Sequence, residues 1–231
     1  MAVVPFLAMT AAEFCGSSFL PAKVGWMACH FSPYSVGLSN LPRNLPEGSL
    51  LIVNDITPIH GHDPEIIVDQ LRNCVDNLRC SGVLLDLQRA DSEETMFMAK
   101  EIVDTLPCAV AVSEIYAGGL SCPVFLPHLP HHIPLVDWIK PWQGREIWLE
   151  VALDAEEITL TKNDTSIHSL PCSLPEDGHP EEILHCHYQL RLQEDSATFT
   201  LWRTRDDIAS LLEEAESLNI HTAVGLWQEF Q

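Results

Sequence analysis

Residues 49–88, SLLIVNDITPIHGHDPEIIVDQLRNCVDNLRCSGVLLDLQ, contain a complete strand–helix–strand unit. The unit begins with SLLIVND and ends with GVLLDLQ, two short apolar runs that each finish in polar residues. Between them, Asp63 precedes Pro64, which is typical of a helix N-cap followed by proline in the first turn. Apolar residues recur at helical spacing over residues 64–79, so we expect an amphipathic helix there. Apolar strands joined by a helix indicate a parallel sheet covered by helices.

The same unit recurs along the chain. Helical spacing at residues 98–106 is followed by another apolar run, and a capped helix after Thr204 leads to a last apolar run at the C-terminus. Eight segments are expected to be strands: Trp26–Ser32, Leu50–Asp55, Gly82–Gln88, Ala109–Glu114, Pro123–Leu126, Glu146–Leu153, Ala197–Trp202 and Thr222–Phe230. Eight strands are the number of a closed β/α barrel. We therefore predict an α/β fold, a compact and irregular TIM-type (β/α)8 barrel.

Three segments depart from a regular barrel. Only eight residues separate Glu114 from Pro123, and a parallel crossover normally needs about a dozen or more. Residues 33–48 are rich in Pro, Gly, Ser and Asn and show no helical period. Residues 185–204 alternate and turn like an antiparallel hairpin. We predict one domain over residues 1–231 with some helices missing and this hairpin inserted; the alternative is an open α/β sheet.

The charge balance excludes several classes of partner. The chain has 231 residues, with 12 Lys and Arg against 33 Asp and Glu, and a formal net charge of −21. Nucleic acid and anionic membranes are bound through clustered basic residues, so neither is an expected partner. A hydrophobic fraction of 46% indicates a globular chain, and no apolar run is long enough to span a membrane.

The cysteines and the N-terminal segment favour a cytoplasmic location. The chain contains eight cysteines, and no two form a C-x-x-C pair. Residues 1–10 are apolar but lack the basic segment of a secretion signal. No phosphate-binding loop or dinucleotide motif is present, so we expect no cofactor.

Candidate functional residues follow the strands, because ligands of parallel sheets and barrels bind at the carboxyl ends of the strands. Carboxylates that converge there repel one another, which raises their pKa values and can supply a general acid and a general base. Aromatic side chains near the mouth suit stacking on sugar rings. The predicted catalytic residues are Asp86, Glu114 and Gln88; the predicted ligand-binding residues are Asn54, Asp55, Tyr116, Glu150, Trp227 and Glu229.

Residues 81–88, SGVLLDLQ, resemble the fourth-strand signature of the family 18 glycoside hydrolases, the chitinase-like barrels, which reads D-G-x-D-x-D-x-E. Gly82 matches the glycine, and Leu84 stands where the first inner aspartate would be. Asp86 matches the second aspartate, and Gln88 replaces the catalytic glutamate. Residues 225–229, GLWQE, are similar to the last strand of that family, where a Trp forms the floor of the sugar subsite. Among the predicted strands, the segment that resembles this signature is the third, one position before the fourth strand to which the signature belongs.

The replacement of the glutamate limits what the resemblance implies. A glutamine amide cannot donate a proton as the glutamic acid does in glycoside hydrolysis. One interpretation is a non-hydrolytic relative that binds a ligand. The other is that the chemistry lies with Asp86 and Glu114, since neighbouring strands are about 4.8 Å apart and this suits a pair of catalytic carboxylates.

The main prediction is that the barrel mouth binds a polar small molecule such as a saccharide, with glycoside hydrolysis left open. Two alternatives remain at this level. A scaffold protein would have a mouth filled by its own loops. A metal-dependent hydrolase would use His and Asp side chains from the loops at residues 60–63 and 128–132, where five histidines occur. We predict no metal site among the main candidates.

Overall fold

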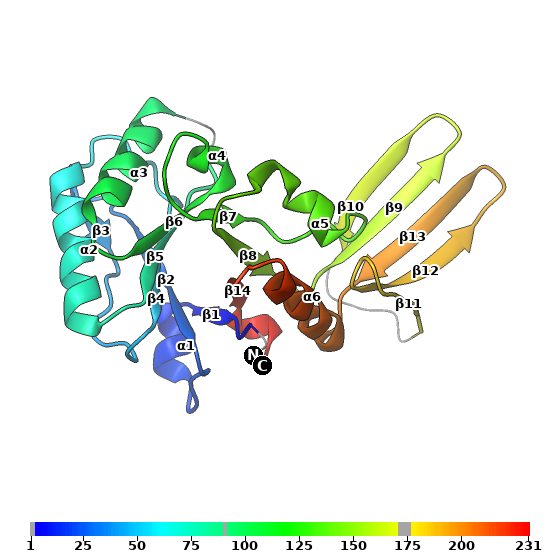
Figure 1. Cartoon of the computed structure of the whole chain (residues 1–231), viewed down its shortest axis with the longest axis horizontal. Coiled ribbons are helices and arrows are strands. Elements are labelled where there is room, and N and C mark those ends of the chain that lie inside the picture. Colours follow the sequence, from blue (N-terminus) through cyan, green and yellow to red (C-terminus); the bar gives the residue numbers. More distant parts are fainter. Residues whose placement is uncertain (1–2, 90–91, 171–176) are drawn as a thin grey trace.

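The computed structural model describes residues 3–89, 92–170 and 177–231, and its centre is a closed barrel of eight parallel strands (Figure 1). The strands, in chain order, are β1 (Phe6–Met9), β2 (Val24–Phe31), β4 (Leu50–Asn54), β5 (Gly82–Asp86), β6 (Ala109–Ser113), β7 (Val124–Leu126), β8 (Ile147–Val151) and β14 (Thr222–Leu226). Strand β1 pairs in parallel with both β2 and β14, which closes the ring. A short strand, β3 (Leu38–Ser39), pairs antiparallel with β2. The predicted TIM-type barrel is confirmed.

One predicted barrel strand lies elsewhere and one barrel strand was not predicted, so the predicted number of eight is still correct. The segment Ala197–Trp202 lies outside the barrel, and β1, which no prediction included, takes its place in the ring. With β1 counted, Gly82–Asp86 is the fourth barrel strand. The segment that resembles the fourth-strand signature therefore stands at the fourth position, and the apparent shift by one strand disappears.

Three long helices pack on the outside of the barrel: α2 (Pro64–Leu78), α3 (Glu93–Thr105) and α6 (Arg205–Ser217). Each begins at a side chain that accepts a backbone N–H of the first turn, namely Asp63, Ser92 and Thr204. Figure 1 shows α2 and α3 side by side. In the described part of the chain, every helix is too short or too polar to cross a bilayer.

The other crossovers are reduced, as predicted. The short segments are α1 (Ala11–Gly16), α4 (Glu114–Ala117), α5 (Leu135–Trp138), and the 3-10 turns η1 (Lys140–Trp142) and η2 (Trp227–Glu229). Residues 33–48, all of them described, contain β3 and no helix. The short link after β6 carries only the single turn α4.

The core has two layers because barrel strands present alternate side chains to the interior and to the helices. The larger layer lies between the strands and the helices and includes Leu85, Val112 and Leu149. The interior layer contains Phe6, Ala8, Leu50, Ile52, Leu84, Ala111, Phe125, Trp148 and Val224. The strands are thus apolar on both faces, and this explains their continuous apolar runs.

A five-stranded antiparallel sheet is inserted between β8 and α6. Its strands are β9 (Ala155–Thr161), β10 (Thr165–Leu170), β11 (His179–Glu181), β12 (Cys186–Leu192) and β13 (Ser196–Trp202), in the spatial order β10-β9-β13-β12-β11. The predicted hairpin at residues 185–204 is the pair β12–β13, so it is confirmed as part of a larger sheet. In Figure 1 this sheet projects away from the barrel beyond α5 and α6.

Candidate functional site

The alternation of side chains along the strands determines which polar residues reach the barrel mouth. Leu84 and Trp148 belong to the interior layer, so residues two positions further along, Asp86 and Glu150, point to the same side. By the same rule Ser113 follows Ala111. These positions lie at the carboxyl ends of β5, β8 and β6, and they bring polar side chains together above an apolar barrel interior.

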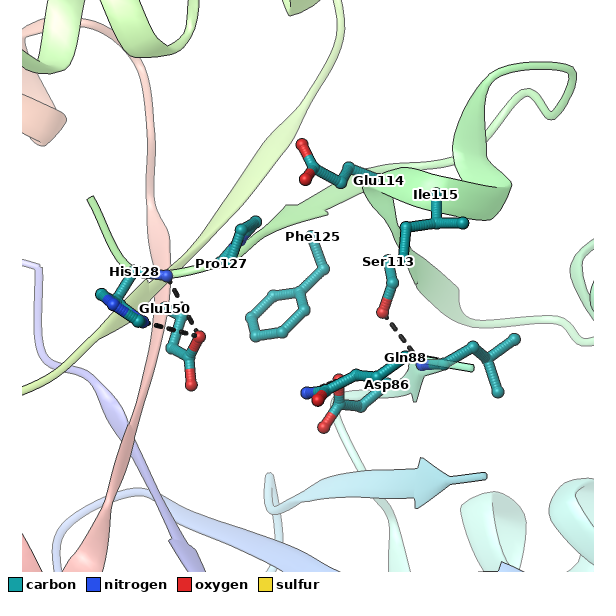
Figure 2. Close-up of a pocket in the computed structure, with 10 residues that line it drawn as sticks. Asp86, Gln88, Ser113, Glu114, Ile115, Phe125, Pro127, His128 and Glu150 are labelled. Atoms are coloured by element: carbon teal, nitrogen blue, oxygen red, sulfur yellow. Dashed lines mark hydrogen bonds and ion pairs between the residues drawn. The ribbon is translucent and has the colours of Figure 1, made fainter. Parts of the chain in front are cut away.

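A cavity of about 450 Å³ opens at this end of the barrel. Its lining residues are Asp86, Leu87, Gln88, Ser113, Glu114, Ile115, Phe125, Pro127, His128 and Glu150. In Figure 2, Asp86 and Gln88 lie on one side of the Phe125 ring, and His128 and Glu150 lie on the other. The cavity therefore combines acidic walls with an aromatic surface, and the mouth is not filled by its own loops.

Asp86 is held by its neighbours on the cavity wall. The Gln88 Nε2 donates to Asp86 Oδ1 at 3.0 Å. Burial raises the pKa of Asp86, and the charges of Glu150 and Asp55 raise it further, while the Gln88 hydrogen bond lowers it. The neighbouring Ser113 hydroxyl accepts the backbone N–H of Leu87 at 2.9 Å and so fixes the end of β5.

Glu114 lines the same cavity but does not pair with Asp86. It begins α4 directly after β6, and burial raises its pKa. Figure 2 shows its carboxylate directed away from Asp86. The predicted catalytic pair of Asp86 and Glu114 therefore shares a cavity without forming a facing pair in this structure.

His128 lies on the opposite wall, next to two carboxylates. Its Nε2 is 3.1 Å from Asp154 Oδ2, and its Nδ1 is 3.7 Å from Glu150 Oε2. The backbone N–H of His128 also donates to Glu150 Oε2 at 3.1 Å. Glu150, and then Asp154, raise the pKa of His128 against the effect of burial. The two carboxylates therefore favour the protonated form of His128.

The polar contacts continue from Asp154 toward the inserted sheet. The fully buried His131 has Nε2 3.5 Å from Asp154 Oδ1 and Nδ1 3.5 Å from Glu156 Oε2. His132 Nδ1 is 3.5 Å from the same Glu156 oxygen. His131 in particular lowers the pKa of Glu156 to about 2. These side chains connect the loop after β7 to β9.

The histidines have other partners than a metal ion. His60 Nδ1 lies 3.1 Å from Glu94, and the His62 ring nitrogens lie 2.6 and 3.0 Å from the carbonyl oxygens of Ile59 and Ser32. Among residues 3–89, 92–170 and 177–231, no group of three or more His, Cys, Asp or Glu side chains could hold a metal ion.

Five of the predicted ligand-binding residues do not line the cavity. Asp55 is buried and accepts the backbone N–H groups of Gln88 and Arg89. Asn54 Nδ2 donates to the carbonyl of Met27. These two side chains hold the loops around the mouth together.

The other three lie in the supporting structure. Tyr116 is fully buried, and its hydroxyl donates to the carbonyl of Arg89 at 3.0 Å. Trp227 lies in η2, beyond the end of the last strand. Glu229 accepts the backbone N–H of Leu153 at 2.9 Å, and burial raises its pKa.

Sequence reasoning missed two main contributors to the cavity. Phe125 belongs to the apolar strand β7 and was assigned no role, although an aromatic residue at an inner position next to a strand end is a usable signal. The sequence places His128 just past a predicted strand and within a histidine cluster, but it was not selected as a site residue; its position two residues beyond β7 was the usable indication.

Comparisons with solved structures place the fold. The family 18 N-acetylglucosaminidase of Paenibacillus barengoltzii has a TM-score of 0.60 at 10% identity, over 97% of this chain and 94% of that chain. The class V chitinase of Nicotiana tobaccum has a TM-score of 0.60 at 8% identity, over 98% and 94%. The spore cortex-lytic enzyme SleL of Bacillus cereus has a TM-score of 0.57 at 8% identity, over 96% and 70%.

No family model matches the sequence, and comparison with curated proteins gives no match. At identities near a tenth, the structural likeness concerns the path of the chain and not the chemistry of the site. The chain therefore has the barrel fold of the family 18 glycoside hydrolases, and the chitinase-like resemblance of residues 81–88 is confirmed at the level of the fold.

Proposed function

We propose that the barrel mouth binds a saccharide. The cavity itself carries this proposal: the carboxylates of Asp86 and Glu150 stand on either side of the Phe125 ring, within about 450 Å³. Carboxylates accept hydrogen bonds from sugar hydroxyls, and an aromatic ring suits the apolar face of a sugar. The names of two structural neighbours, a chitinase and an N-acetylglucosaminidase, support testing chitin fragments first.

Binding is favoured over hydrolysis by the residues at the end of β5. Gln88 stands where the resemblance implies the catalytic glutamate, and its amide is donating to Asp86. An amide cannot deliver the proton that a departing sugar needs. Glu114 points away from Asp86 and does not replace the missing acid in this arrangement.

Isothermal titration calorimetry with N-acetylglucosamine and its short oligomers tests the proposal. We expect saturable binding that weakens in Asp86→Asn and Glu150→Gln, because both lose a charged acceptor on the cavity wall. Asp69→Asn is the matched control, since Asp69 lies on the exposed side of α2 and pairs with Arg72. Equal affinity in all four proteins, or no binding of any saccharide, would overturn the proposal.

Product analysis separates a binding protein from an enzyme. The wild-type chain is expected to leave chitin oligomers intact during long incubation. Turnover that disappears in Asp86→Asn would show that the chemistry has moved to another acid. The variant Gln88→Glu restores a carboxyl group at the end of the signature, so weak hydrolysis by this variant alone would support the resemblance.

A further inference from the structure

The inserted antiparallel sheet has an apolar face whose outer rows are exposed in the described part of the chain. Directly opposite residues in antiparallel strands share a face, so the strand register shows which side chains lie together. One row runs across four strands: Ile167 on β10, Ile158 on β9, Phe199 on β13 and Leu190 on β12. The next row contains Leu160, Ala197 and Leu192. We call these residues the apolar sheet face.

The reverse of the sheet is polar over the same strands. Its rows contain His168, Glu157, Thr200 and Gln189, followed by Ser166, Thr159, Thr198 and Arg191. Such strict alternation is typical of a sheet with one face against an apolar layer and the other in water. In this sheet the apolar side lacks that layer.

Exposure of the side chains confirms that the layer is missing. Leu192 is 72% exposed, and Ile167, Leu190 and Leu160 are 47%, 43% and 39% exposed. Neither of the two core clusters found among the described residues includes a residue of the apolar sheet face. Figure 1 shows why: the sheet extends beyond α5 and α6, which lie near its base. A contiguous apolar surface of this kind marks an interaction site.

The inserted sheet is acidic as a whole, and this favours a partner surface with basic residues. Residues 155–202 contain nine Asp and Glu against two Lys and Arg. The turn between β12 and β13 presents Glu194 and Asp195, and the turn between β9 and β10 presents Lys162 and Asp164. Glu156, at the base of the same face, is already paired with His131 and His132.

We propose that the apolar sheet face docks a different protein, one whose contact surface has an apolar centre and a rim of Lys and Arg. A second copy of this chain would bring its own acidic β12–β13 turn and acidic insert to the interface, and like charges across an interface are unfavourable. An anionic membrane is opposed by the same excess of acidic residues. A basic rim on the partner complements the turns, while its apolar centre covers the exposed rows.

Fluorescence polarisation with two synthetic amphipathic peptides tests this on the full chain. Both peptides carry the same Leu and Phe residues; one is flanked by Lys and the other by Glu. We expect the Lys peptide to bind, and the variants Leu190→Ser and Leu192→Ser to weaken binding about tenfold, since they remove apolar contact at exposed positions. The matched control is Gln189→Ser, on the same strand but on the polar face.

The outcomes separate the alternatives. Equal binding by Leu190→Ser, Leu192→Ser and Gln189→Ser would show general charge attraction and overturn the proposal. So would a stable dimer in sedimentation that Leu192→Ser dissociates, because a second copy would then occupy the face. Binding to phosphatidylglycerol vesicles in preference to the Lys peptide would also overturn it. Unchanged melting temperatures exclude misfolding as the cause, and none of the three substituted positions lines the cavity tested with saccharides.

Discussion

Replacing Arg203 by Met is expected to lower the free energy of unfolding by about 2–4 kcal/mol. Arg203 follows β13 and is 1% exposed. Its guanidinium donates to four backbone carbonyls, those of Leu129, Pro130, Leu184 and His185. These carbonyls belong to the loop after β7 and to the segment before β12. One side chain therefore joins the barrel rim to the inserted sheet.

The magnitude follows from the four bonds. The bond to Leu129 is 2.5 Å and the bond to His185 is 3.2 Å, while the other two are 3.4 Å. A hydrogen bond from a charged donor contributes roughly 1.5–3 kcal/mol, so the two shorter bonds contribute about 3–6 kcal/mol. Burial opposes this contribution and lowers the pKa of Arg203. Because Met has no charge to desolvate, part of the decrease in the free energy of unfolding is offset.

Urea denaturation followed by far-UV circular dichroism measures the effect. Arg203→Lys keeps the charge but not the planar set of donors, so its stability should fall between those of the wild type and Arg203→Met. Arg72→Met is the control, because its ion pair with Asp69 is exposed and contributes at most about 1 kcal/mol. If Arg203→Met and Arg72→Met destabilise equally, the guanidinium does not hold the two parts together as described.

Three further predictions concern the charged rim and the fourth strand. The pKa of Glu156 is lowered from 4.5 to about 2, so its ionised carboxylate contributes fully to folding stability above pH 4.5, and this contribution is lost as the pH falls toward 2. In Glu156→Gln, urea midpoints should therefore fall less over this range. The raised pKa of Asp86 means that its ionised form opposes folding, so Asp86→Asn should stabilise by about 0.5–2 kcal/mol at pH 7 and by little at pH 3, as calorimetry would show. In Gly82→Ala the new Cβ would stand 2.8 Å from the Ala109 carbonyl oxygen, and thermal melting should report a loss of about 1–3 kcal/mol. An unchanged pH profile, an Asp86→Asn protein no more stable at pH 7, or a neutral Gly82→Ala would each contradict the corresponding reasoning.

The barrel could be predicted from the sequence because its strands are apolar on both faces and are followed by capped helices. The run LLIV in β4 and the run GVLL in β5 show this pattern directly. Strand β13 misled because it too precedes a capped helix. Its alternation of Ala197, Phe199 and Leu201 with polar residues was the distinguishing signal, since a barrel strand between two apolar layers does not alternate. Strand β1 has only four residues, too few for any period to emerge.

The site was predictable where the strand alternation fixes the direction of a side chain. Asp86 and Glu150 are inner strand positions and line the cavity, whereas Asp55 lies just beyond β4 and accepts backbone N–H groups of the next loop. The rule that ligands gather at strand ends gives the location of the candidate site, but it does not say in which direction each side chain points. Where a side chain follows the strand, as Glu114 does, only the local backbone decides its orientation.

Closure of the barrel depends on two segments from opposite ends of the sequence. Strand β1 aligns Phe6 with Val224, so this seam cannot form during synthesis until β14 has been made. Pairing across so long a loop is entropically costly and slow. Before that event, Asp86 and Glu150 lie along one open sheet, on strands separated by β6 and β7. The two walls of the cavity face each other only in the closed ring, so a chain that lacked this last pairing would keep Asp86 and Glu150 on an open sheet without the enclosed cavity.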